Sequence, residues 1–122
     1  MLKISNAELE VLKVFWEQDV ITSNDIIKAL KDYPWSSNTI RTLIKRLLKK
    51  GAIEITGKVG KSYTYKVTLD EGKFKSEMTL DLLKKFYDGS LNKFIAENFD
   101  DSKRDQLLEL QKSLEELKRR KY

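Results

Sequence analysis

The sequence predicts a mainly α-helical chain with one small β-hairpin, in which three short helices and the hairpin precede three further helices. Three observations support this fold class. Along the 122 residues, apolar side chains recur first at helical spacing, then alternate between residues 53 and 67, and then return to helical spacing. Ser, Thr and Gly stand where such helices would begin and end. The length suits one domain, or one domain with an appendage.

A first helix is predicted over residues 6–17. Ser5 and Glu8 have the spacing of a capping box, in which each residue bonds the backbone of the other. Apolar residues follow at helical intervals, namely Leu9, Leu12, Phe15 and Trp16. We interpret them as packing residues rather than as ligand contacts.

A second, shorter helix follows a connection over residues 19–21. Thr22 or Ser23 can cap its start. It ends by residues 32–34, because Pro34 restricts the residue before it and interrupts helical hydrogen bonding. Its inner face carries Ile26, Ile27 and Leu30.

A third helix is capped by Ser36 or Ser37 and closed by Gly51, since a left-handed residue is favoured after a helix end. One face is apolar, with Ile40, Leu43, Ile44 and Leu47. The opposite face carries Asn38, Arg41, Thr42, Lys45 and Lys49. The helix is therefore anchored on one side and polar on the other.

After Gly51 the pattern alternates, as in two short strands of a hairpin. The alternating residues are Ile53, Ile55, Tyr63, Tyr65 and Val67. Between the two strands we expect a flexible, basic tip made of Gly57, Lys58, Gly60 and Lys61. Three helices followed by a hairpin is the order of a winged helix-turn-helix, which we assign to residues 1–69.

Residues 70–122 are predicted to form a three-helix dimerisation domain. This segment has 12 Lys and Arg against 12 Asp and Glu, and its last leucines are spaced by 3, 4 and 3 as in paired helices. Three amphipathic helices cannot easily enclose a core of their own, so we expect a second subunit to complete it. The alternative is that they fold back on the first domain. The expected dimer contacts are Phe74, Met78, Leu82, Phe86, Leu91, Phe94, Ile95, Leu107, Leu110, Leu114 and Leu117.

The composition argues against most enzyme chemistry. The chain has no Cys and no His, so it lacks a thiolate nucleophile, the usual general base and the commonest metal ligands. A site made of carboxylates alone stays open, but no acidic cluster stands out. We therefore expect no catalysis, no cofactor and no metal. Without a long apolar run we expect no membrane insertion either, and a cytoplasmic location.

The basic charge is concentrated in one stretch. The whole chain carries a formal +5, whereas residues 36–66 hold eight Lys and Arg against Glu54 alone. Such a field suits a polyanion, because neutralising phosphates releases counterions and supplies affinity that does not depend on sequence. The alternative is a basic face that is merely solvated.

The polar face of the third helix fits the major groove of DNA. Asn38 can bond adenine, Arg41 can read guanine, and Thr42 can offer its methyl or hydroxyl group to a base. For Arg41, the alternative is an ion pair on the protein surface. Side chains deeper along the helix and on the wing suit phosphates better than bases. The expected backbone contacts are Trp35, Ser37, Lys45, Arg46, Lys49, Lys50, Lys58, Lys61 and Tyr63.

For the aromatic residues near this face, the sequence allows either a DNA contact or a packing role. The indole N–H of Trp35 can donate to a phosphate, or its ring can pack on the start of the helix. Tyr63 and Tyr65 share a strand face, so one or both can either approach a phosphate or cover the core.

Two stretches, SNAELEVLKVFW at 5–16 and WSSNTIRTLIKRLLKKGAI at 35–53, resemble the penicillinase-repressor family of bacterial regulators, which includes the methicillin-resistance repressors. The most specific part lies at residues 39–47, and the similar layout continues through Tyr87, Gly89 and the last helices. The resemblance implies a homodimer on a dyad-symmetric operator that represses a β-lactam resistance operon. It implies base contacts from Asn38, Thr39, Arg41 and Thr42.

The resemblance has two further implications. In the resistance members, induction follows cleavage of an Asn-Phe bond and is initiated through a membrane sensor. This chain has the pair Asn98-Phe99, which lies about one residue further from Gly89 than the resemblance implies for the cleaved pair. An accidental Asn-Phe inside a helix is the alternative. Copper-responsive members carry paired cysteines near the C-terminus, and their absence here excludes copper sensing of that kind.

We therefore expect a sequence-specific transcriptional repressor that binds a palindromic operator of double-stranded DNA as a homodimer. An inducing protease of a membrane-sensor pathway is a possible partner. The alternative function is a winged-helix module that binds protein or RNA and has no specific operator.

Overall fold

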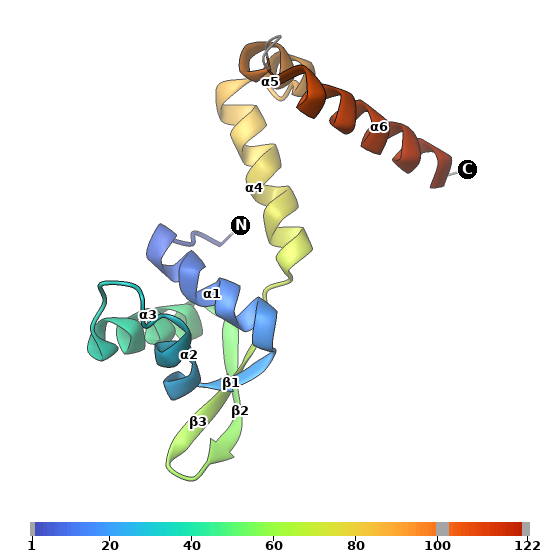
Figure 1. Ribbon diagram of the computed structural model, residues 1–122. Coiled ribbons are helices and arrows are strands. Elements are labelled where there is room, and N and C mark those ends of the chain that lie inside the picture. Colours follow the sequence, from blue (N-terminus) through green and yellow to red (C-terminus); the bar gives the residue numbers. More distant parts are fainter. Residues whose placement is uncertain (1, 100–102, 121–122) are drawn as a thin grey trace. The chain divides into compact units, whose positions relative to one another are not determined.

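The computed structural model describes residues 2–99 and 103–120 (Figure 1). The elements follow one another as α1 (Asn6–Gln18), β1 (Val20–Thr22), α2 (Ser23–Ala29), α3 (Ser37–Lys50), β2 (Ile53–Val59), β3 (Ser62–Val67), α4 (Glu71–Phe86), α5 (Leu91–Asn98) and α6 (Arg104–Arg120). The chain divides into two compact units, Met1–Glu77 and Met78–Tyr122, which are described separately. The predicted fold class, mainly α with a small β-hairpin, is confirmed, and the hairpin is part of a three-stranded sheet.

The first two helices begin at capping boxes. Ser5 Oγ accepts from the Glu8 backbone N–H at 3.1 Å, and Glu8 Oε1 accepts from the Ser5 N–H at 2.9 Å. Thr22, rather than Ser23, caps α2, with Asp25 as its reciprocal partner. α2 ends at Ala29, before the end at residues 32–34 that Pro34 predicts.

The third helix has both of its predicted ends. Ser36 caps it by accepting from the Thr39 N–H at 3.1 Å, and Gly51 follows it with φ 78° in the left-handed region. The buried residues of α3 are the predicted apolar stripe of Ile40, Leu43, Ile44 and Leu47. The polar face is thereby left toward solvent.

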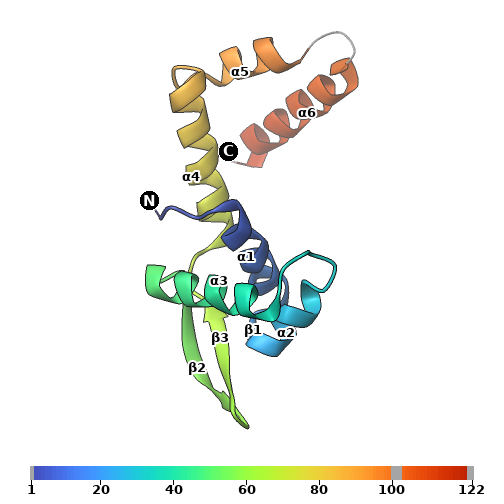
Figure 2. The same ribbon diagram turned by 90° about the vertical axis from the view of Figure 1, so that its left-hand side faces the viewer.

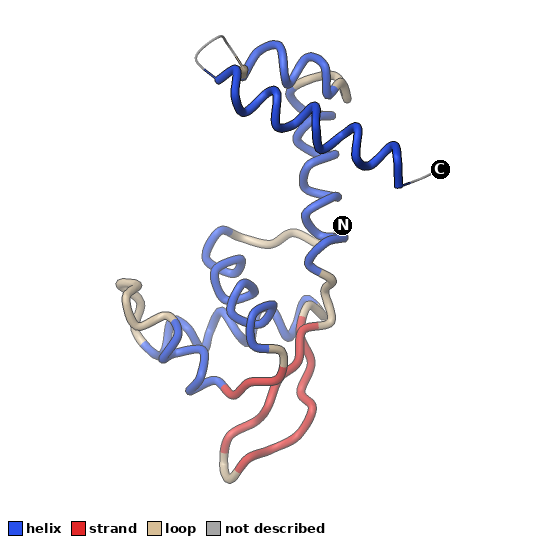
Figure 3. The backbone as a smooth tube through the Cα atoms, turned by 45° about the vertical axis from the view of Figure 1, so that its right-hand side comes forward, coloured by secondary structure: helices blue, strands red, loops and turns tan. Residues whose placement is uncertain are grey.

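The sheet has a third strand that the sequence pattern does not predict. Val20 and Ile21 were expected in a connection and Thr22 as a possible helix cap, but all three form β1. This strand pairs antiparallel with β3, and the strand order is β1-β3-β2 (Figure 3). Ile21 lies opposite Tyr65 and is buried. A strand of three residues is too short to show alternation, so only pairing reveals it.

The hairpin is longer than expected and its turn is tighter. Gly57 and Lys58 were predicted in the tip, but both lie in β2, because pairing continues after a register shift between Ile55 and Gly57 as far as Val59. The turn is therefore only Gly60 and Lys61, with Gly60 at φ 62°, as a two-residue hairpin turn with glycine first favours. Figure 2 shows the β2–β3 hairpin, the wing, extending beyond the helices of the first unit.

One apolar core joins α1, α2, α3 and the base of the sheet. Its side chains that are less than 2% exposed include Val11, Leu12, Phe15, Ile26, Ile40 and Leu47. The edge of the core is closed by Trp16, whose Nε1 donates to the Leu69 carbonyl at 2.9 Å. The Trp16 ring lies 5.8 Å from that of Phe74 in α4.

Phe74 was predicted as a dimer contact, and its burial corrects this prediction. It is 6% exposed and packs inside the first unit, so little of its surface remains for a partner. The predicted division at residue 69 follows the change in composition, whereas the first compact unit runs on to Glu77 because the start of α4 packs on α1 through Phe74.

The second unit buries few of its apolar side chains. Leu83 is buried, whereas Leu82, Phe86 and Leu91 are exposed, Phe86 by 73%. Partly buried positions among the predicted dimer contacts are Met78, Phe94, Ile95, Leu107 and Leu110. The side chains of Leu114 and Leu117 lie outside the described part of the chain.

An aromatic cluster within the second unit joins α5 to the residues that flank it. The Phe94 ring lies edge-on to Tyr87 at 5.4 Å and to Phe99 at 6.2 Å. Asn98, the last residue of α5, donates through Nδ2 to Tyr87 Oη at 3.0 Å and to the Phe94 carbonyl at 2.8 Å. Phe99 is extended, with φ −118° and ψ 117°. The Asn98-Phe99 bond therefore lies at a helix end rather than inside a helix.

Candidate nucleic-acid interface

The exposed face of α3 carries all four predicted base-reading residues. Asn38, Thr39, Arg41 and Thr42 are exposed, and they lie opposite the buried stripe. Arg41 forms no ion pair with any side chain that the structure describes, so the surface ion pair considered for it is not present there. Its guanidinium keeps its donors for an external acceptor.

Two hydroxyl groups on this face are partly committed inside the protein. Thr42 Oγ1 donates to the Asn38 carbonyl at 3.0 Å, and Thr39 Oγ1 lies 3.0 Å from Ser36 Oγ. Thr42 therefore presents to the outside its methyl group and an oxygen that can accept, which suits contact with a thymine methyl group or a base amine.

The predicted phosphate contacts on α3 divide into two groups. Ser37, Lys45, Arg46 and Lys49 are exposed and have no internal ion pair among the described residues. Lys50 is a correction, because its ammonium group donates to Glu8 Oε1 at 2.6 Å and to the Lys3 carbonyl at 2.7 Å. Lys50 therefore ties the end of α3 to the start of α1 and is not free for a phosphate.

On the wing, the two tyrosines have different roles. Tyr63 is 46% exposed, and Lys58 Nζ, on the paired strand, lies 5.0 Å from the centre of its ring. This cation–π contact orders an exposed charge near the tip. Tyr65 packs against the core, and burial, followed by the nearness of Tyr63, raises the pKa of the Tyr65 phenol.

The turn before α3 is braced by aromatic stacking. The rings of Tyr33 and Trp35 lie 4.9 Å apart at 22°, and Trp35 also packs against the core. Tyr33 Oη donates to Glu10 Oε2 at 2.6 Å, which joins this turn to α1. Trp35 thus has a packing role, and its phosphate contact stays a prediction.

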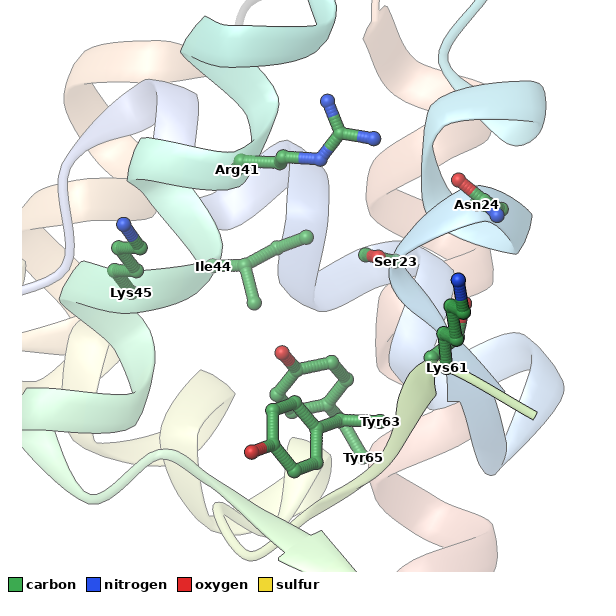
Figure 4. A pocket seen from close by; sticks show the side chains of 9 residues that line it. Ser23, Asn24, Arg41, Ile44, Lys45, Lys61, Tyr63 and Tyr65 are labelled. Atoms are coloured by element: carbon green, nitrogen blue, oxygen red, sulfur yellow. The ribbon is translucent and has the colours of Figure 1, made fainter. Parts of the chain in front are cut away.

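A pocket of about 320 Å³ opens where α2, α3 and β3 meet (Figure 4). Its lining contains predicted DNA contacts, Ile44 of the buried stripe, and Tyr65, for which the sequence allowed either a phosphate contact or packing. Three further lining residues were not singled out as DNA contacts, namely Ser23, Asn24 and Ser62. Pairing of β1 with β3 sets Thr22 opposite Thr64, which brings the start of α2 beside the wing. Without β1, nothing in the sequence indicated that the start of α2 lies next to the wing.

Other kinds of site find no support in the part of the chain that is described. Those residues include no cluster of three or more acidic, His or Cys side chains that could hold a metal ion. None of the described helices is both long and apolar enough to cross a membrane.

A basic, exposed third helix beside a basic wing is the DNA-binding surface of the winged-helix class of proteins. The sequence profile of the penicillinase repressor family matches residues 4–116. The chain belongs to this family, as the resemblance implied.

Individual relatives are consistent with this assignment. The penicillinase repressor of Bacillus licheniformis is 40% identical over 123 residues, covering 98% of this chain and 94% of that protein. The solved DNA-binding domain of the repressor BlaI is 46% identical, covers 57% of this chain and 84% of its own, and has a TM-score of 0.52. Monomeric BlaI of Bacillus licheniformis, solved in complex with the blaP half-operator, is 42% identical with a TM-score of 0.50, covering 58% of this chain and 87% of its own.

Proposed function

We propose that this chain represses transcription by binding a palindromic operator as a homodimer, and that it controls a β-lactamase-type resistance operon or a related one. Its family makes it a DNA-binding regulator rather than an enzyme. The observation that carries the proposal is the free polar face of α3, in a fold similar to a repressor solved on its half-operator. Repression follows because a protein bound at an operator blocks access of polymerase.

In this mechanism α3 lies in the major groove and the wing follows the backbone. Asn38 bonds adenine, Arg41 donates to O6 and N7 of guanine, and Thr42 contacts a thymine methyl group. Lys45, Arg46 and Lys49, with Ser37 and the wing residues Lys58, Lys61 and Tyr63, set the register by contacting phosphates. The buried stripe of α3 supports this arrangement, because it holds the helix firmly against the core.

A homodimer explains the exposed apolar side chains of the second unit. Leu82, Phe86 and Leu91 are each more than 40% exposed, which is costly for side chains of this size unless another surface covers them. A two-fold dimer presents two copies of α3 to two half-sites, so the operator is palindromic.

The proposed inducing event is cleavage of the Asn98-Phe99 bond by a protease of a membrane-sensor pathway. Its support is the family resemblance together with the place of the bond at the end of α5, where Phe99 is already extended. The proposed location is the cytoplasm, because the operator DNA that the protein would bind lies there.

The test compares two substitutions on α3. Genomic fragments that bind the protein are first selected to obtain the operator. Arg41→Ala is then expected to cost about 1 to 3 kcal/mol on the operator and to relax sequence preference, whereas Lys49→Ala weakens binding to operator and random duplex alike. Affinities are measured on both duplexes at one fixed salt concentration.

Equal losses for Arg41→Ala on operator and random duplex would remove Arg41 from base reading. If the unchanged protein itself showed no preference among genomic fragments, the alternative of an interaction module without an operator would replace the proposal.

A further inference from the structure

The pocket between α2, α3 and β3 has an unusual lining for a surface cavity of about 320 Å³. It contains three cationic side chains and no carboxylate. Its lining residues are Ser23, Asn24, Arg41, Ile44, Lys45, Lys61, Ser62, Tyr63 and Tyr65. A cavity that gathers cations and neutral hydrogen-bond donors without an acid is suited to an anion.

The pocket has two chemically different walls. The α3 wall carries Arg41 and Lys45, which belong to the face that is proposed to enter the groove. The facing wall comes from α2 and the wing, with Ser23 and Asn24 on one element and Lys61 in the turn before β3. In Figure 4, Arg41 reaches from α3 toward α2, and the rings of Tyr63 and Tyr65 close the β3 side.

The nearest acidic residue along α2 lies outside the pocket and its carboxylate is held in the helix cap. Asp25 Oδ2 accepts from the Thr22 backbone N–H and from Thr22 Oγ1, both at 3.0 Å, as part of the capping box. Asp25 is not among the lining residues. The hydroxyl of Ser23 and the amide of Asn24 are neutral groups that can donate to an oxygen without adding repulsion.

We propose that this pocket seats one phosphate of the operator backbone. Asn24 and Ser23 donate to its oxygens, and Lys61 neutralises its charge, while α3 on the other wall reads the adjacent groove. The inference rests on the proposed function and adds α2 to the interface. It makes Asn24 a contact that fixes the register of the protein on the duplex, because phosphate contacts position a protein while base contacts specify sequence.

The experiment replaces phosphates of the half-site one at a time by neutral methylphosphonates and measures the affinity of the full-length protein for each duplex. At one position the unchanged protein is expected to lose about tenfold. Asn24→Ala and Lys61→Gln are each expected to lose several-fold on the native duplex and nothing further on the duplex that is neutral at that position. Asn24→Asp, which introduces a negative charge, loses more on the native duplex and regains most of that loss on the neutral one.

Matched controls lie outside the pocket. Asn6→Ala changes an exposed residue in the first turn of α1, and Lys28→Gln removes an exposed charge from α2. Both are expected to bind native and neutral duplexes as the unchanged protein does. Circular dichroism and urea unfolding of each variant separate a loss of contact from a loss of folding.

The pocket assignment is overturned if Asn24→Ala and Lys61→Gln lose the same factor on every duplex, neutral or native, because the side chains and a single phosphate would then be uncoupled. Failure of the proposed function gives a different result, since the unchanged protein would then show no preference for the operator over random duplex.

Discussion

At the scale of single residues, the pair formed by Glu8 and Lys50 joins two helices and removes one cation from the DNA surface. The Glu8 side chain is 2% exposed, that of Lys50 33%, and their charged atoms lie 2.6 Å apart. Glu8 Oε2 is buried without a hydrogen-bond partner in the described structure. Only one of the two carboxylate oxygens is thus satisfied, which makes the lysine important.

Lys50→Met is expected to destabilise the protein by about 2 to 3 kcal/mol. The reason is that a buried carboxylate loses its partner, and the loss stays below that of a fully buried pair because a third of the Lys50 side chain is exposed. Urea unfolding measures the loss. The double variant Glu8→Leu with Lys50→Met should recover most of it, and a double variant as unstable as the single one would contradict the explanation.

The same pair predicts a pH dependence. Burial raises the pKa of Glu8, but hydrogen bonds from Lys50 and Ser5 outweigh it, so the pKa of Glu8 in the folded protein lies below its ordinary value of 4.5. A lowered pKa stabilises the fold above the unfolded value, and this contribution is lost as pH falls from 4.5 through the folded pKa.

Unfolding free energies measured from neutral pH down to about pH 3 should therefore fall more steeply for the unchanged protein than for Glu8→Gln. The difference between the two proteins isolates this carboxylate from the others. Parallel pH profiles would show that Glu8 does not titrate differently in the folded state.

At the scale of elements, the start of α3, the proposed recognition helix, is held by the Ser36 cap. Ser36 Oγ accepts from the Thr39 N–H, and the two side-chain oxygens also lie within hydrogen-bond distance. Because Thr39 is one of the predicted base contacts, the cap also holds a side chain of the DNA face in place.

Ser36→Ala is expected to cost about 1 kcal/mol of stability, as loss of a helix cap does. It should also weaken binding to the operator, because the first turn of α3 frays. Thermal unfolding and operator affinity measure the two effects. Ser76→Ala, an exposed serine within α4, is the control and should change neither. Full stability in Ser36→Ala would mean that Ser37 or water replaces the cap.

The element scale also shows where prediction succeeded and where it stopped. The capping box of α1, the αL glycine after α3 and the apolar stripe of α3 are local patterns, and the structure confirms them. β1 was missed, and Gly57 and Lys58 were misplaced, because a strand is defined by its partner. The same non-local pairing decides which side chains line the pocket, so no local pattern marked Ser23 and Asn24 as DNA contacts.

At the scale of the whole molecule, the second unit is expected to hold two copies of the chain together. Phe86 is 73% exposed at the end of α4, which is more than a large aromatic side chain usually has in a monomer that needs no partner. It is the strongest single candidate for an anchor of the dimer.

Phe86→Asp is expected to weaken the dimer by about 2 kcal/mol or more, because it removes the proposed anchor and places a charge in the proposed interface. Sedimentation at micromolar concentration measures the shift toward monomer, and the helical circular dichroism should stay the same. Ser76→Asp, which adds the same single negative charge at an exposed position of α4, is the control. A monomeric unchanged protein would overturn the dimer proposal.

The sequence by itself determined the order of helices, the anchored and free faces of α3, and the concentration of basic charge between residues 36 and 66. These follow from periodicity, capping and charge, which are properties of neighbouring residues. Only the tertiary structure decided that Lys50 turns to Glu8, that Phe74 packs on Trp16, and that α2 meets the wing around a pocket. Each of these joins residues far apart in the chain, where no local pattern records which side chains will meet.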